Sequence, residues 1–101
     1  MNSKPQKHKV AGSGSRPIID LSGKWVTAMM GNSETVTITD SQGESFTRKS
    51  GSNKGNRRIW IEGVELTRRN LTPGTPLMRV MTSESSFTLT ASGETLTIVR
   101  N

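Results

Sequence analysis

Hydrophobic and polar residues alternate with a period of two along much of the chain. In residues 35–39, TVTIT, threonines occupy every second position and apolar side chains lie between them. The same alternation recurs in residues 86–90 and 95–99. Successive side chains of a strand point to opposite faces, and β-branched threonine suits a solvated pleated surface. These segments therefore predict antiparallel strands with one buried face.

Turn-forming residues separate the predicted strands at residues 40–43, 83–85 and 92–93. Two helix-sized segments, residues 23–30 and 63–71, each follow an apolar strand and begin with a glycine. Each is only about two turns long, so tertiary packing must stabilise it. The sequence thus predicts a mainly β protein, a small barrel or sandwich of six to seven short antiparallel strands with one or two short helices.

Two parts of the chain share one pattern. Residues 19–26, IDLSGKWV, and residues 59–66, IWIEGVEL, both read apolar-x-apolar-polar-Gly-x-x-apolar at an offset of 40. Phe46 and Phe87 lie in the hairpins that follow, at an offset of 41. This repetition predicts a single β domain, residues 16–101, made of two related halves, 16–50 and 57–101, joined by a Gly/Ser/Asn linker.

Residues 1–15 differ from the rest of the chain. They contain Lys4, Lys7 and Lys9 and almost no apolar side chains. Such a segment cannot bury enough surface to offset the entropy of ordering it, so we expect a disordered basic tail. Two interpretations remain open for it, a basic arm along a phosphate backbone or a loose terminus.

The residue inventory excludes several kinds of chemistry. The chain of 101 residues has no cysteine and a single histidine, His8, within the tail. Disulfides, thiolate metal sites and His-based triads are therefore excluded, and the eight acidic residues form no spaced metal or nuclease motif. We expect no enzyme, no catalytic or metal site and no cofactor. Because no segment has the apolar run of a signal peptide or membrane span, we expect a cytoplasmic protein without membrane contact.

The charge balance favours an acidic partner. Fourteen Lys and Arg against eight Asp and Glu give a net charge of +6 and a pI near 10.6. Such a balance is typical of nucleic-acid binding, although an acidic protein surface or simple solubility is also compatible with it. The candidate contact residues are the cations grouped around the linker and the second helix-sized segment, Lys54, Arg57, Arg58, Arg68, Arg69, Arg48 and Lys49. They predict either a basic patch, with Arg68 and Arg69 facing solvent, or merely a solvated face.

Two features near this patch need interpretation. Gly63 permits a tight strand-to-helix turn, but Glu62 and Glu65 flank it and would repel an anion, so the turn is not expected to bind phosphate. Trp60 alternates with two isoleucines and is either an exposed stacking platform or a cover for the second side of the barrel. Trp25 is expected in the core.

The repeated unit resembles the SymE-like branch of the AbrB/MazE superfamily. The resemblance is carried by Leu21, Gly23 and Trp25 in the first half and by Gly63, Leu66, Leu71 and Gly74 in the second. The pattern departs at Glu65 and Leu71, where the family has Trp and Phe, and the first half lacks the Pro-Gly turn. Family members pair two such units from two chains into a swapped-hairpin barrel that binds DNA. The resemblance therefore implies an intramolecular version of that barrel.

Two function hypotheses follow. The favoured one is a small non-enzymatic DNA-binding protein of AbrB-like type, acting as a transcriptional or antitoxin-type regulator. The alternative is a phage or mobile-element inhibitor that binds an acidic surface of a host defence protein, such as a CRISPR effector (anti-CRISPR type). The partner is DNA under the first hypothesis and a protein under the second, and a homodimer remains open under both.

Overall fold

The computed structural model describes residues 4–101. Within that range it contains ten strands and two helices, more strands than the six to seven predicted, while the mainly β class is as predicted. The elements are β1 (Gln6–Lys9), β2 (Ala11–Ser13), β3 (Arg16–Ser22), α1 (Lys24–Met30), β4 (Thr35–Thr39), β5 (Ser45–Lys49), β6 (Gly51–Asn53), β7 (Asn56–Glu62), α2 (Val64–Thr67), β8 (Pro76–Ser83), β9 (Ser86–Ala91) and β10 (Glu94–Arg100).

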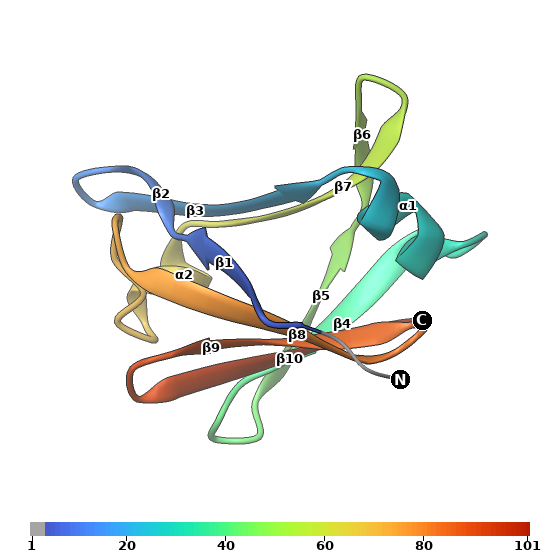
Figure 1. Cartoon of the computed structure of the whole chain (residues 1–101). Helices are drawn as coiled ribbons and strands as arrows, with labels where there is room; N and C mark the ends of the chain where they lie inside the picture. The colour runs from blue at the N-terminus through green and yellow to red at the C-terminus, as the bar shows by residue number, and fades with distance from the viewer. Residues whose placement is uncertain (1–3) are drawn as a thin grey trace.

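The strands form two antiparallel sheets that pack against each other (Figure 1). The larger sheet has the order β1-β8-β9-β10-β4-β5, and the smaller has the order β2-β3-β7-β6. A single residue, Val10, separates β1 from β2, and Ser50 separates β5 from β6. At each of these two corners the chain therefore passes directly from one sheet to the other. The sheets remain separate and do not close into one barrel.

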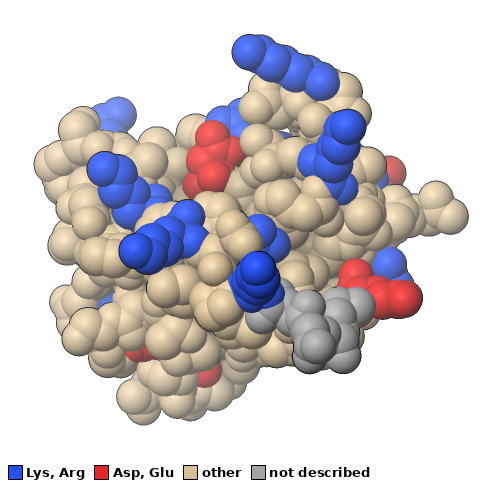
Figure 2. Space-filling model, in the orientation of Figure 1, with Lys and Arg blue, Asp and Glu red and all other residues tan. Residues whose placement is uncertain are grey.

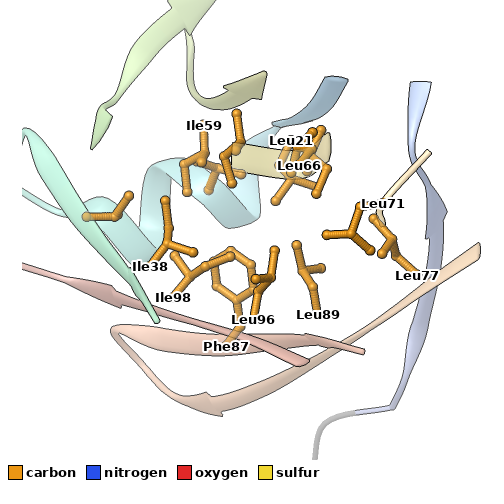
Figure 3. Packing of buried hydrophobic residues seen from close by; sticks show 14 of the residues in the cluster. Leu21, Ile38, Ile59, Leu66, Leu71, Leu77, Phe87, Leu89, Leu96 and Ile98 are labelled. Carbon is orange, nitrogen blue, oxygen red and sulfur yellow. The ribbon is translucent and has the colours of Figure 1, made fainter. Parts of the chain in front are cut away.

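The core lies between the two sheets, where alternate side chains point inward from the longer strands β3, β4, β7, β8, β9 and β10 (Figure 3). In the smaller sheet Ile59 and Ile61 are fully buried, whereas the intervening Trp60 is half-buried on the outer face. In the larger sheet a row of paired residues crosses four strands, from Phe87 through Ile98 and Ile38 to Phe46. Each fully buried side chain of this size contributes roughly 1.5–3 kcal/mol.

Each helix begins directly after a strand and one glycine. Gly23 and Gly63 have φ values of 131° and 77°, which side chains with a Cβ rarely adopt. The helix α1 matches its prediction and buries Val26, Met29 and Met30. The helix α2 is shorter than predicted, and its buried residue is Leu66.

The two strand–glycine–helix units are related by a local two-fold axis. Asp20 faces Trp60 at the middle of the antiparallel pair β3–β7, and the flanking pairs are Ile19–Ile61 and Leu21–Ile59. Ile19 and Leu21 correspond to Ile59 and Ile61 at an offset of 40 residues, so the two-fold axis exchanges the two flanking pairs. The hairpin pairs Ser13–Arg16 and Asn53–Asn56 obey the same offset. The turns of these two hairpins lie at opposite ends of the smaller sheet (Figure 1).

The structure differs from the prediction of a disordered tail and a linker. Residues 6–9, 11–13 and 51–53 are strands. β1 pairs with β8 from Gln6–Arg79 to Lys9–Pro76, and Val10 is 1% exposed. Long-range backbone pairing and one buried side chain at the corner therefore order a segment of polar composition. The first three residues of the predicted tail lie outside the described residues.

Candidate nucleic-acid interface

Arg69, predicted to face solvent, is buried. Its side chain is 5% exposed, and its Nε donates a hydrogen bond to Oδ2 of Asp40 at 2.8 Å. Its Nη1 donates to the backbone oxygen of Glu65 at 2.6 Å. Burial acts to raise the pKa of Asp40, but backbone N–H donors and Arg69 outweigh it and hold that pKa below its usual range. Arg69 follows Leu66 by three residues, and positions three apart share one side of a helical turn.

Arg68 is exposed but already paired. Its guanidinium lies 2.9 Å from the carboxylate of Glu44 and 3.5 Å from that of Glu65. Together with Arg69 it borders a hollow whose lining also includes Asp40 and Glu94. Because carboxylates surround both Arg68 and Arg69, which directly follow α2, this part of the predicted basic patch is not a free cationic surface.

Arg58 is also paired, in a different setting. Its Nε and Nη2 donate to the two carboxylate oxygens of Asp20 at 2.7 and 3.0 Å. Its guanidinium carbon Cζ lies 4.1 Å from the centre of the Trp60 ring. The hydrogen bond to Asp20 raises the pKa of Arg58, so this side chain keeps its charge. Arg58 and Trp60 thus form a stacked pair on the outer face of the smaller sheet.

The four other predicted cations have no carboxylate partner among the described residues. Lys49 and Lys54 are exposed, and Lys54 lies in the β6–β7 turn. Arg57 donates from Nη2 to the backbone oxygen of Ser33 at 2.9 Å and also contacts the Ser50 hydroxyl. Arg48 lies over the Phe46 ring, with Cζ 4.8 Å from its centre. The structure therefore divides the seven predicted residues into three that are paired and four that are not.

Several unpaired cations lie in segments that the sequence did not assign to the site. The chain has 14 Lys and Arg residues. Among those in the described range, three form an ion pair with a carboxylate, namely Arg58, Arg68 and Arg69. Lys7 and Lys9 are exposed on β1, Arg16 is exposed where β3 begins, and Lys24 is exposed where α1 begins. Lys and Arg side chains are spread over the face that carries β1 and α1, with fewer acidic groups (Figure 2).

The strands β1 and β5, each of which ends at a corner, present a lysine at equivalent places. Lys9 is the last residue of β1 and directly precedes the corner residue Val10. Lys49 is the last residue of β5 and directly precedes the corner residue Ser50. The two lysines are 40 residues apart, which is the offset of the local two-fold axis. A Lys-x-Lys pair in residues 7–9 was the available sequence signal, but the polar context favoured a tail.

A cluster of buried and partly buried aromatic and basic groups holds β1 against the core, and Trp25, which was expected in the core, packs partly buried at its edge. The guanidinium carbon of Arg79 lies 3.6 Å from the centre of the Trp25 ring, and Arg79 Nε donates to His8 Nε2 at 3.1 Å. Trp25 packs edge-on against Phe87, with ring centres 5.2 Å apart. Burial lowers the pKa of Arg79, and burial together with the Arg79 charge lowers the pKa of His8. Arg79 thus holds β1 in place.

The described residues contain no group of three or more His, Cys, Asp or Glu side chains that could hold a metal ion. Over the same range, neither helix has the length and apolar character needed to cross a membrane. Comparisons of the chain with protein-family models, with curated proteins and with solved structures find no match.

Proposed function

We propose that this is a small, non-enzymatic DNA-binding protein of AbrB-like type that acts in the cytoplasm as a transcriptional or antitoxin-type regulator. The observation that carries the proposal is the layout of the unpaired cations. Lys9 and Lys49 occupy equivalent places at the two corners, and neither has a carboxylate partner. Lys7, Arg16 and Lys54 extend the positive charge along the attached strands and turns.

Unpaired lysines are the cations best suited to phosphate contacts. A lysine without an internal partner can neutralise a phosphate and release counterions from the DNA, which favours binding. A guanidinium such as that of Arg69 would first have to leave Asp40 and expose a buried carboxylate. We therefore assign the phosphate contacts to β1, β5 and the hairpins that follow them, and we assign Arg68 and Arg69 to stability.

The two-fold relation of the corners also suits a nucleic acid. The backbones of a duplex are related by two-fold axes, and DNA-binding dimers commonly match that symmetry. Here one chain supplies both halves, because β3 and β7 pair about Asp20 and Trp60. A second copy of the chain is not required for the two-fold arrangement. The halves are not identical, since Arg58 occupies the place that corresponds to Ile18.

The proposal is tested by titrating a fluorescently labelled DNA, as duplex and as separate strands, at several salt concentrations. We expect the logarithm of the association constant to fall linearly with the logarithm of salt concentration. The association constants for unrelated DNA sequences should be similar. Failure of both DNA forms to bind beyond a weak association near ~10⁻⁴ M would contradict the proposal. That result would favour the alternative, an inhibitor that binds an acidic surface of a host defence protein.

A further inference from the structure

The outer face of the smaller sheet has an aromatic ring at its centre. Trp60 lies opposite Asp20 on the local two-fold axis, and its ring is half-buried. Its neighbours along β7, Ile59 and Ile61, are both 0% exposed and point into the core. Trp60 therefore contributes to the surface of the sheet, in the middle of the region that separates the two hairpin turns.

Arg58 forms a second flat group on the same surface. Two hydrogen bonds to Asp20, of 2.7 and 3.0 Å, fix the plane of its guanidinium, and the group stacks 4.1 Å from the centre of the Trp60 ring. The Arg58 side chain nevertheless remains 31% exposed. A bidentate ion pair of this kind has a specific geometry and holds the guanidinium in a fixed orientation. Because Asp20 already balances its charge, Arg58 presents a planar surface for stacking and not a free cation for a phosphate.

The charges around this stacked pair are unevenly placed. Asp20 and Glu62 bring carboxylates next to Trp60, and Glu62 is exposed. Free cations lie farther out, with Arg16 where β3 begins and Lys54 in the β6–β7 turn. A phosphate at the centre would meet those carboxylates and be repelled, whereas phosphates at the two ends would meet cations. An uncharged planar group fits the centre best.

We infer that Trp60 and Arg58 form a stacking platform for one unpaired base of the bound nucleic acid. The inference rests on the proposed function and deepens it by naming the DNA form that the site takes. Bases stack on aromatic rings and on arginine planes when they are free of their own stack. A base inside a paired duplex is not free, and exposing it costs unstacking and unpairing energy. The platform should therefore add affinity for single-stranded or locally unpaired DNA, beyond the phosphate contacts that the corner lysines can make with either form of DNA.

The test measures both affinity and tryptophan fluorescence. Trp60→Leu should weaken binding of a single strand about tenfold or more while changing duplex binding little. Arg58→Lys keeps the positive charge but removes the planar guanidinium, and it should also weaken single-strand binding. In a Trp25→Phe variant, checked for folding by circular dichroism, Trp60 is the remaining tryptophan. Its emission should be quenched by a single strand and much less by the same strand with abasic sites.

Two results would overturn the inference. If single strands bind with strong salt dependence but Trp60→Leu and Arg58→Lys bind them as the wild type does, the platform is not used. Unchanged Trp60 emission at a saturating concentration of single strand would also show that the platform is not used. It would not contradict the proposed lysine contacts. Failure of the wild type to bind either DNA form would overturn the proposed function and the stacking platform together.

Discussion

His8 accepts a hydrogen bond from Arg79, with 3.1 Å between His8 Nε2 and Arg79 Nε, and this bond joins β1 to β8. The same arginine stacks on Trp25, whose ring centre lies 6.3 Å from that of His8. The first strand is thus attached by side chains as well as by backbone pairing. Lys7 and Lys9, which we assign to phosphate contacts, have their positions fixed by this attachment.

Removing β1 and its corner should destabilise the fold. Deletion of residues 1–13 takes away the β1–β8 pairing, the His8–Arg79 bond and the buried Val10 side chain. Val10→Ala alone should lower the free energy of unfolding by roughly 2 kcal/mol, because it removes buried methyl groups. Urea unfolding measures both variants, and the exposed Lys9→Ala serves as the control. A truncated protein as stable as the full chain would show that β1 is not part of the fold.

The stability should fall in mildly acidic solution because of His8. Burial, followed by the charge of Arg79, lowers the pKa of His8 below its ordinary value of 6.5. The unfolded chain therefore takes up a proton near pH 6.5 while the folded chain does not, so unfolding is favoured as the pH falls below that value. Unfolding free energies at pH 7.5 and 5.5 test this. In His8→Gln, which keeps an acceptor for Arg79 but does not titrate, the difference should largely disappear.

Arg68 and Arg69, which follow α2, should differ sharply in their contribution to stability. Arg69→Met leaves the carboxylate of Asp40 without its buried partner, and Asp40 is 9% exposed. Arg68→Met removes only surface ion pairs, which contribute about 0–1 kcal/mol. We expect the Arg69 variant to lower the thermal midpoint several times more than the Arg68 variant. Equal, small effects would mean that Arg69 is as exposed as the sequence pattern suggested.

The two phenylalanines of the repeat should not be energetically equal. Phe87 is 0% exposed, and its replacement by Ala should cost roughly 3–5 kcal/mol. Phe46 faces Ile38 as Phe87 faces Ile98, but it is only partly buried, beneath Arg48 and Arg69. Phe46→Ala should therefore cost clearly less when measured by urea unfolding. The reverse order would contradict the burial described for the two halves.

Much of the fold could be predicted from local patterns, and the remainder depends on distant contacts. The alternating threonines predicted β4, β9 and β10, and the glycines predicted where both helices begin. The strands β1, β2 and β6 were missed because their residues are polar, glycine or alanine, and the one buried side chain beside them is that of Val10, between β1 and β2. Their order comes from pairing with strands far away in the chain, which leaves no periodic signal in their own residues.

The candidate site shows a similar division. Charge and composition alone identified Lys49 and Lys54 as candidate contacts, and both are exposed and unpaired among the described residues. The same reasoning failed for Arg69, whose pairing with Asp40 joins residues 29 positions apart. Whether a cation is free for a ligand depends on which carboxylates the fold brings to it. That information is not present in the sequence around the arginine.

The central claim is that the corner lysines Lys9 and Lys49, and not Arg68 and Arg69, contact DNA phosphates. The most direct measurement is the salt dependence of duplex DNA binding. It compares the wild type, the double variant Lys9→Gln with Lys49→Gln, and Arg68→Gln as an exposed control. Each lost phosphate contact lowers the slope of log K against log salt by about 0.9 in a duplex. We predict a decrease of about 1.8 for the double lysine variant and almost none for Arg68→Gln. An unchanged slope for the lysine variant, or an equal decrease for the Arg68 variant, would contradict the claim.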